Sequence, residues 1–560
     1  MTQVSVNSAE QSSSVESADP AAPAVASTAP ADAATGPATG EVPATGEPAT
    51  AEPASGEPAA AQPAAAQPVA TQAAAAGGLV ITAGPVERVM SWVIRKLAWS
   101  RLARPRVAMA ISGLGLLLSM FVSSTAPNIE TLPVRLPLSH LLPSFQNMPI
   151  LPSTILYTGD VLACLGLAGM LWAHSQGWRP NPRHLLLASA VIVAIMVCLT
   201  PVGSSDTGSY AAYGRITALG GNPYVANPHT WLAHHPGYFS YYHVVGWAWE
   251  KQPSVYGPIA TVIQAFAAWI GGPSVTITIW LLMILNGIVF IGIGVLLLKT
   301  SDDPIRATLF WVANPVLIMQ LVGGGHLDTL VAGAAICAIQ VARRARGVWG
   351  DVLVGVMIGL ACGVKVTAVL IALGLAWPLL RRHEWRRTAR IAAIALVTVG
   401  LEYIPYGLVG LKPLFGGLKL VGLPSPWWVF YAVGHYVLGF SKNAVETPVS
   451  YLWPVALIIV ALLIYKRISS DQPREVVAPF ALAFAWILVA PWVFAWYTAL
   501  AWVALTQVPR NRMTRWLTIV TVVLALWHSS GGQAPIHVMA AHLGHPPMPR
   551  AGPGLVGPGG

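Results

Sequence analysis

Residues 274–298 read SVTITIWLLMILNGIVFIGIGVLLL and contain no charged side chain. A helix of this length extends about 37 Å at 1.5 Å per residue, which exceeds the roughly 30 Å hydrocarbon core of a bilayer. Because lipid tails offer no hydrogen-bond partners, the backbone of such a segment is satisfied there as a helix. The stretch therefore predicts a membrane-spanning helix.

Twelve further apolar stretches resemble it. The chain is 55% hydrophobic and 10% charged, whereas a soluble domain has about 25% charged residues. Its mean hydropathy is +0.60. These features predict an all-α polytopic membrane protein. The stretches are 107–125, 153–173, 184–202, 306–322, 326–342, 350–364, 366–380, 390–407, 449–465, 476–492, 493–508 and 515–530.

Charge is distributed unevenly along the chain. Residues 1–86 contain eight of the 22 acidic residues and none of the 32 basic ones. Connectors rich in Lys and Arg stay on the cytoplasmic side of a membrane, so the basic clusters indicate which span ends are inside. They are too dispersed to form a nucleic-acid groove. The clusters are Arg179/Arg183, Arg343/Arg344/Arg346, Arg381 to Arg390, Lys466/Arg467/Arg474 and Arg510/Arg512/Arg515.

These clusters fix the expected topology. With the N-terminus and the clusters inside, the chain makes about thirteen crossings and its C-terminus is outside. Segment 256–272 is then a re-entrant or interfacial helix at the outer face, and 425–440 belongs to an outer loop. The longest non-terminal polar stretch, 203–255, also lies outside.

The ends of the chain differ in composition from the rest. Residues 1–86 are rich in Ala, Pro, Thr, Gly and Glu with PATGEPAT-like repeats, which predicts a disordered tail. The tail lacks the basic start and apolar core of a signal peptide, so we expect it to stay in the cytoplasm. Residues 87–106 are a basic amphipathic segment expected along the inner leaflet. Residues 107–530 form the predicted transmembrane domain, and 531–560 a flexible outer tail.

The predicted outer loop begins with Ser205-Asp206-Thr207, directly after a span. A carboxylate at this boundary can meet both a lipid-borne reactant and one arriving from water. The alternative is a helix N-cap, a common role for Ser and Asp. The loop is also rich in aromatic residues, which suit either an interfacial belt or stacking on sugar rings. They include Tyr210, Tyr213, Tyr224, Trp231, Tyr238, Tyr241, Tyr242, Trp247 and Trp249.

Two other polar clusters fall on the same predicted side. They are Gly323-Gly324-Gly325-His326-Leu327-Asp328 and Gly363-Val364-Lys365-Val366-Thr367. Asp328 as a helix cap and Lys365 as a snorkelling side chain are the structural alternatives. Ionisable residues at membrane depth are nevertheless functional by default expectation. The topology does not depend on these residues, so their co-location with Asp206 and Arg215 predicts a site.

No set of residues has the spacing of metal ligands. The four cysteines lie in apolar segments, and His234-His235 lacks a second ligand pair. The C-terminal His537, His542 and His545 are also irregularly spaced. No cofactor is expected, and a divalent metal is left open.

Asp160 and Glu402, inside apolar runs, are expected to be buried and hydrogen-bonded. Asn314-Pro315 and Pro405 predict helix kinks.

These motifs resemble those of the GT-C superfamily of polyprenyl-phosphate-sugar glycosyltransferases, and especially its actinobacterial MptB-type alpha-1,6-mannosyltransferases. The resemblance covers roughly residues 100–530. Many GT-C enzymes carry two adjacent acids where this chain has Ser205-Asp206, so one base must suffice or Asp328 assists. The matching motifs are Ser205-Asp206-Thr207-Gly-Ser-Tyr210-Ala-Ala-Tyr213-Gly-Arg215, Gly220-Gly221-Asn222-Pro223-Tyr224, Val255-Tyr256-Gly257-Pro258, Asn314-Pro315, Gly324-Gly325-His326-x-Asp328 and Gly363-x-Lys365-x-Thr367.

The resemblance implies a GT-C-like fold and an inverting transfer of mannose. The implied donor is polyprenyl-phosphate-mannose, and the implied acceptor is a lipid-anchored mannan in lipomannan and lipoarabinomannan synthesis for the cell envelope. The leaving group departs as a phosphate anion, so the second carboxylate of a glycoside hydrolase is not required. Asp206 is the expected base. Lys365, His326 and Arg215 are expected to bind the donor phosphate, and Tyr210, Tyr256, Trp247 and Asp328 the sugars.

Other functions fit the same sequence features. A glycosyltransferase using polyprenyl-phosphate arabinose or glucose would use the same scaffold. A secondary transporter also has many spans, but it concentrates ionisable groups near the membrane midplane and often has repeated halves. A non-catalytic scaffold subunit is the third class, and its polar residues would be individually replaceable. The residues alone fix neither the sugar, the acceptor nor the oligomeric state.

Overall fold

In the computed structural model, residues 104–527 are described apart from 129, 146–147, 149, 234, 247–248, 345, 418–420, 423–424 and 469–472. The predicted tails 1–86 and 531–560 lie outside the described residues. So do most of the predicted interfacial segment 87–106, His234 and Trp247.

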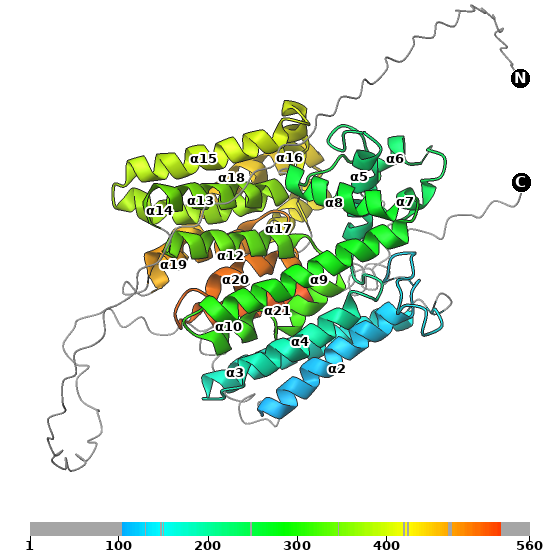
Figure 1. Ribbon diagram of the computed structural model, residues 1–560, viewed down its shortest axis with the longest axis horizontal. Coiled ribbons are helices and arrows are strands. Elements are labelled where there is room, and N and C mark those ends of the chain that lie inside the picture. The colour runs from blue at the N-terminus through cyan, green and yellow to red at the C-terminus, as the bar shows by residue number, and fades with distance from the viewer. Residues whose placement is uncertain are drawn as a thin grey trace, which may run out of the picture. The chain divides into compact units, whose positions relative to one another are not determined.

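The described residues form helices joined by loops, with one isolated β-bridge between Thr131 and Val202. Figure 1 shows most of the longer helices running roughly alongside one another. The elements are α2 (Pro105–Ser124), α3 (Ile150–Ser175), α4 (Pro182–Met196), α5 (Asp206–Ala218), α6 (Pro228–Trp231), α7 (Phe239–His243), α8 (Pro258–Gly271), α9 (Val275–Thr300), α10 (Pro304–Phe310), α11 (Pro315–Leu317), η2 (Ile318–Gly323), α12 (Asp328–Arg344), α13 (Gly347–Val364), η3 (Val366–Ala368), α14 (Val369–Arg381), α15 (Trp385–Tyr403), η4 (Leu408–Leu411), α16 (Lys412–Gly417), α17 (Trp427–Ala432), η5 (Val433–Val437), α18 (Lys442–Arg467), α19 (Arg474–Val489), η6 (Ala495–Tyr497), α20 (Thr498–Leu505) and α21 (Met513–Trp527).

The helices confirm the predicted class, an all-α polytopic membrane protein. Among the described residues, five helices are long and apolar enough to cross a membrane, or seven if each of two bent pairs is one span. The remaining apolar helices are shorter, so the number of thirteen crossings stays a prediction. The predicted re-entrant segment 256–272 contains only the 14-residue α8. The predicted loop element 425–440 contains the short α17 and η5.

Both predicted kinks are present. The Asn314 side chain accepts hydrogen bonds from the backbone N–H groups of Val316 and Leu317, which starts a new helix at Pro315. The two halves of this segment meet at an angle of 41°. Around Pro405, α15 ends at Tyr403, and the following helical stretch departs at 109°. Proline removes a backbone donor and clashes with the preceding turn, so each bend follows from the sequence.

One end of the helix bundle gathers the basic connectors, and we call it the basic end. The buried Arg306 guanidinium donates to the carbonyls of Leu505 and Val508, at 3.2 and 2.7 Å. Arg343 donates to Gln507 at 2.7 Å. The buried Asp351 carboxylate, at the start of α13, pairs with Arg387 at 2.7 Å. These hydrogen bonds and this ion pair therefore join, at the basic end, connectors that are far apart in the sequence.

The opposite end, which we call the site end, is also held by bonds between distant loops. The Val202 amide donates to the Gly323 carbonyl at 3.0 Å, and the Gly257 amide to the Val364 carbonyl at 3.1 Å. These bonds join the segments before α5 and before α8 to the ends of η2 and α13. The predicted loop 203–255 and both glycine-containing clusters thus meet at one end of the bundle.

Helices α2 and α3 lie against each other at a distance that only small residues permit (Figure 1). A Cβ atom on Gly115 would lie 2.7 Å from the Gly159 carbonyl oxygen and 2.8 Å from the Ala163 nitrogen. Gly115→Val is therefore expected to destabilise the protein by about 1–3 kcal/mol through overpacking. Gly113→Val is the control, because a Cβ at Gly113 meets no atom within 4 Å. Thermal unfolding in detergent measures both, and equal stability of the two variants would contradict the close packing.

Candidate active site

Helix α5 begins at Asp206, which places this carboxylate at the site end. The N-cap residue is Ser205, and its side chain makes no capping hydrogen bond. Asp206 is the first helical residue, so the N-cap alternative does not describe it. Its backbone N–H donates a hydrogen bond to the Ser204 hydroxyl oxygen, 3.1 Å away. An acidic side chain in the first turn is favoured by the helix dipole, and its side chain retains 21% exposure.

The glycine turn between η2 and α12 packs directly on the start of α5. The Thr207 hydroxyl donates to the Gly324 carbonyl at 3.1 Å. Gly325 has φ +68°, and a Cβ there would lie 2.4 Å from the Thr207 hydroxyl oxygen. Its left-handed conformation and the close approach both require glycine. From the other side, the Asn286 amide donates to the Leu321 and His326 carbonyls, at 2.8 and 3.1 Å. The turn is thereby fixed between α5 and α9.

This packing brings His326 to Asp206. The Nδ1 atom of His326 lies 3.3 Å from Oδ2 of Asp206. The imidazole is 1% exposed and is stacked on Trp496, with ring centroids 3.8 Å apart and an interplanar angle of 11°. The Trp496 ring in turn stacks on Phe494, at 4.6 Å. The aromatic stack holds the plane of the imidazole, so one edge of the ring faces the carboxylate.

The second glycine-containing cluster brings Lys365 to Asp328. The Lys365 Nζ lies 3.0 Å from both oxygens of the Asp328 carboxylate and 4.1 Å from the centroid of the Tyr497 ring. Burial alone lowers the pKa of Lys365, but the Asp328 carboxylate outweighs it, and the pKa of this amine is raised above its usual 10.5. Lys365 is therefore charged at neutral pH, and its charge is balanced by Asp328 rather than by water.

The two pairs form one electrostatic cluster. Asp206 contributes, after Asp328, to the raised pKa of Lys365, and Trp496 and Tyr497 are consecutive residues that contact one member of each pair. The Asp328 carboxylate is paired with Lys365, and the Asp206 carboxylate lies against His326. No group of three or more His, Cys, Asp or Glu residues in the described part of the chain is arranged to hold a metal ion.

Two tyrosines lie behind Asp206. The Tyr210 hydroxyl lies 3.5 Å from Asp206 Oδ2, and its ring packs edge-on against Tyr256, with centroids 4.9 Å apart. The exposed fractions of Tyr210 and Tyr256 are only 1% and 9%. Burial raises the pKa of the Tyr210 phenol well above its usual value, so it remains protonated. Tyr210 thus lies against the Asp206 carboxylate and Tyr256 packs on Tyr210, while the sugar contacts of both residues stay a prediction.

Arg215 is not part of this cluster. It lies nine residues along α5 from Asp206, about 14 Å away by helix rise. Its buried guanidinium donates to the Ala268 and Gly272 carbonyls at the end of α8 and lies over the ring of Tyr241 at 4.9 Å. A cation is favoured at the carbonyl end of a helix. In the structure Arg215 therefore joins α5 to α8, and its predicted phosphate contact stays a prediction.

Replacing Arg215 by Met is expected to lower stability and to leave the chemistry of each folded molecule unchanged. Loss of charged hydrogen bonds costs about 2–3 kcal/mol. Thermal unfolding and turnover per folded molecule measure the two effects, and Arg183→Met, at an exposed position, is the control. A normally stable Arg215→Met protein with turnover reduced a hundredfold would place Arg215 in the site.

Trp496 and Tyr497 are not among the residues predicted from the sequence, because 493–508 has the composition of a plain apolar span. The signal was present in Trp492-Val493-Phe494-Ala495-Trp496-Tyr497, an unusual density of aromatic residues after Pro491.

Asp160 is buried as expected, with Gln320 as a hydrogen-bond partner. Glu402 differs from expectation, because its two carboxylate oxygens are buried without a hydrogen-bond partner in the described structure.

Comparison with known proteins gives one family match and several relatives. Residues 110–381 match the MptA_B family, described as "Alpha-(1->6)-mannopyranosyltransferase, N-terminal domain". Alpha-(1->6)-mannopyranosyltransferase A of Mycobacterium tuberculosis is 25% identical over 398 residues, which are 64% of this chain and 72% of the relative. Alpha-(1->6)-mannopyranosyltransferase B of Corynebacterium glutamicum is 30% identical over 228 residues, 38% of this chain and 37% of the relative.

A third relative, alpha-(1->6)-mannopyranosyltransferase A of Corynebacterium glutamicum, is 26% identical over 39% of this chain and 50% of its own length. The chain thus spans half or less of the two corynebacterial proteins. No solved structure gives a significant match. Asp206, His326, Asp328 and Lys365 all fall inside the family match, whereas Trp496 and Tyr497 lie beyond it. The resemblance carried by the motifs is confirmed, because residues 110–381 match the alpha-(1->6)-mannopyranosyltransferase family model and the relatives above carry that name.

Proposed function

We propose that this protein is an inverting mannosyltransferase that takes mannose from polyprenyl-phosphate-mannose and attaches it in alpha-1,6 linkage to a lipid-anchored mannan. The reaction takes place at the outer face of the plasma membrane, in lipoglycan synthesis for the cell envelope. The observation that carries the proposal is the approach of His326 to Asp206 at 3.3 Å, within the segment that matches the mannosyltransferase family.

The geometry supports a single-base mechanism. The acceptor hydroxyl oxygen attacks the anomeric carbon of mannose, the bond from that carbon to the phosphate oxygen breaks, and Asp206 takes the hydroxyl proton. His326, held against Trp496, orients the Asp206 carboxylate. The polyprenyl phosphate departs as an anion, so protonation of the leaving group is not required. One ionised carboxylate meets the needs of this reaction, and Asp328 is already neutralised by Lys365.

Lys365 is the proposed electrostatic partner of the departing phosphate. Fixed cations aimed at developing charge lower the barrier of group transfer, and the raised pKa of Lys365 keeps it charged. Its side chain is 12% exposed, so a phosphate in contact with it would be largely shielded from water. Asp328 and Tyr497 hold the amine in place before the donor binds.

A lipid-borne donor is supported by the surface next to Lys365. The exposed fractions of Val366, Val369 and Leu373, which follow Lys365 along η3 and α14, are 45%, 40% and 54%. An apolar helix face of this kind faces lipid in a membrane protein. A prenyl chain lying along α14 would bring its phosphate to the site end of that helix. The Lys and Arg side chains favour a cytoplasmic location for the basic end, and therefore an outer location for the site end.

The direct test is transfer by the purified chain in nanodiscs. We expect it to use polyprenyl-phosphate-mannose and a mannan acceptor, with an alpha-1,6 linkage in the product by linkage analysis. Polyprenyl-phosphate arabinose and glucose are the competing donors. Preference for either of them would replace mannose in the proposal while leaving the reaction type intact. Accumulation of labelled substrate in proteoliposomes without any glycosyl transfer would instead favour the transporter alternative.

A further inference from the structure

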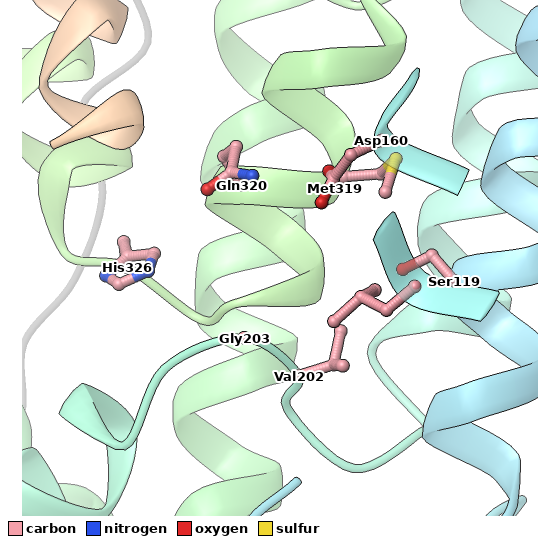
Figure 2. Close-up of a pocket in the computed structure, with 8 residues that line it drawn as sticks. Ser119, Asp160, Val202, Gly203, Met319, Gln320 and His326 are labelled. Carbon is pink, nitrogen blue, oxygen red and sulfur yellow. The ribbon is translucent and has the colours of Figure 1, made fainter. Parts of the chain in front are cut away.

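A second polar cluster lies deeper in the helix bundle than the Asp206 carboxylate. Eight residues line a small pocket with a cavity volume of about 10 Å³, the space open to the centre of a water molecule. Its polar members are Ser119, Asp160, Gln320 and His326. Asp160 is ten residues into α3, about 15 Å from the start of that helix. The pocket therefore begins at the active-site histidine and extends inward between α2, α3 and η2 (Figure 2).

The pocket contains buried polar atoms that the described protein leaves without partners. Asp160 is 2% exposed and its Oδ2 has no hydrogen-bond partner, and the same holds for the hydroxyl of Ser119, which is 0% exposed. Leaving such a group unsatisfied costs about 1–3 kcal/mol. Two unpartnered groups facing one small void are the usual environment of an ordered water molecule, which needs two to four polar partners.

Gln320 connects the acid to the histidine. Its side chain is a hydrogen-bond partner of the Asp160 carboxyl group. In Figure 2 Gln320 lies between His326 on one side and Asp160 on the other. His326 thus belongs to two environments, because it faces Asp206 through Nδ1 and forms part of the pocket wall. In a neutral imidazole, the bond made by one ring nitrogen decides which nitrogen carries the proton.

We propose that this pocket holds one ordered water molecule that Asp160, Ser119 and Gln320 fix against His326, and that Asp160 is a positioning residue for the His326–Asp206 pair. The water determines the tautomer and rotation of the imidazole, so that its Nδ1 side remains directed at Asp206. The proposal rests on the proposed transferase function and adds a buried network behind its base.

The occupant is a water molecule and Asp160 is a neutral acid. Among the described residues, no Lys or Arg forms an ion pair with Asp160, and an unpaired charge in an apolar interior is costly. A neutral carboxyl group has both a donor and an acceptor, which is what a bridging water requires. The pocket admits about one water molecule, so it is too small for a sugar or a phosphate. A sodium ion is the competing occupant and would require an ionised Asp160.

The test compares two replacements of Asp160 in the full chain in nanodiscs. Asp160→Asn keeps a donor and an acceptor of the same shape, so its kcat should stay within about threefold of wild type. Asp160→Leu removes both, and its kcat should fall about tenfold with KM unchanged, as expected when a buried hydrogen bond is lost. Ser119→Ala is a milder variant in case Asp160→Leu fails to fold, with Ser112→Ala on the same helix as the matched control.

The outcomes separate this inference from the proposed function. Wild-type kcat in folded Asp160→Leu and Ser119→Ala proteins would overturn the inference and leave the transferase intact. Equal losses in Asp160→Asn and Asp160→Leu, with activity dependent on sodium, would replace the water by a cation and also overturn it. A high-resolution map of the full chain checks the pocket without any assay. Density for one water between Asp160 and His326 supports the inference, and an empty pocket contradicts it.

Discussion

Asp206→Asn is expected to lower kcat for mannosyl transfer by about 10²–10⁴-fold, the usual effect of losing a general base. The amide has nearly the shape of the carboxylate but cannot accept the acceptor's proton. KM for the donor should change little, because Lys365 rather than Asp206 is the proposed phosphate contact. Initial rates with purified protein in nanodiscs, normalised to folded protein, measure the effect.

Glu250→Gln is the matched control for this variant. Glu250 lies in the same predicted loop and accepts a hydrogen bond from the Tyr242 hydroxyl at 2.9 Å, so it is a carboxylate held by a neighbour outside the cluster. Its replacement should leave kcat within about threefold of wild type, since it lies away from the reacting atoms. If Asp206→Asn retained wild-type kcat, or if Glu250→Gln were equally impaired, Asp206 would not be the base.

Breaking the Lys365–Asp328 pair is expected to have the largest effect on stability. Removing one partner of a buried ion pair costs about 3–5 kcal/mol, because the other charge is left uncompensated. The side chains of Lys365 and Asp328 are 12% and 8% exposed, so Lys365→Met and Asp328→Asn should both be strongly destabilised. The double replacement Lys365→Met/Asp328→Leu should recover much of the stability, yet turn over slowly because no cation faces the phosphate.

Unfolding in detergent and turnover per folded molecule distinguish these two roles. A double variant that is both stable and fully active would show that the pair only supports the fold.

The stability of the folded protein should depend on pH with a definite sign. Because the pKa of Lys365 is raised on folding above its usual 10.5, the contribution of the lysine charge to stability is fully present below that value. It is lost only as the pH rises through the higher folded value.

The membrane fold follows from the sequence more readily than the site does. Long uncharged runs such as 274–298 have one stable arrangement in lipid, which is why the all-helical class was predictable. Short apolar segments are harder, because a 14-residue helix such as α8 fits both a short span and a re-entrant element. The number of spans therefore has to be predicted from which connectors are basic and so cytoplasmic. The helices by themselves do not test that prediction.

The site was partly predictable for a related reason. The positions of the basic connectors predicted that Asp206, His326, Asp328 and Lys365 lie on one side of the membrane. The structure brings these four residues together at one end of the bundle. Their pairing depends on side-chain packing between helices distant in the sequence, which a pattern does not encode. Trp496 was not predicted as a site residue, because an aromatic residue in an apolar run is compatible with ordinary burial. Arg215 was predicted on the same side, but the structure places it nine residues along α5 from Asp206, where it bonds to the end of α8.

The sidedness of Ser204 shows directly whether the proposed base lies at the outer membrane face. A cysteine at position 204, two residues before Asp206, is treated with a membrane-impermeant maleimide in intact cells and in inverted vesicles. Lys251→Cys in the same loop and Arg346→Cys at the basic end are the references. We expect positions 204 and 251 to be labelled from outside and position 346 only in inverted vesicles. Labelling of position 204 on the same side as position 346 would exclude a base at the outer face.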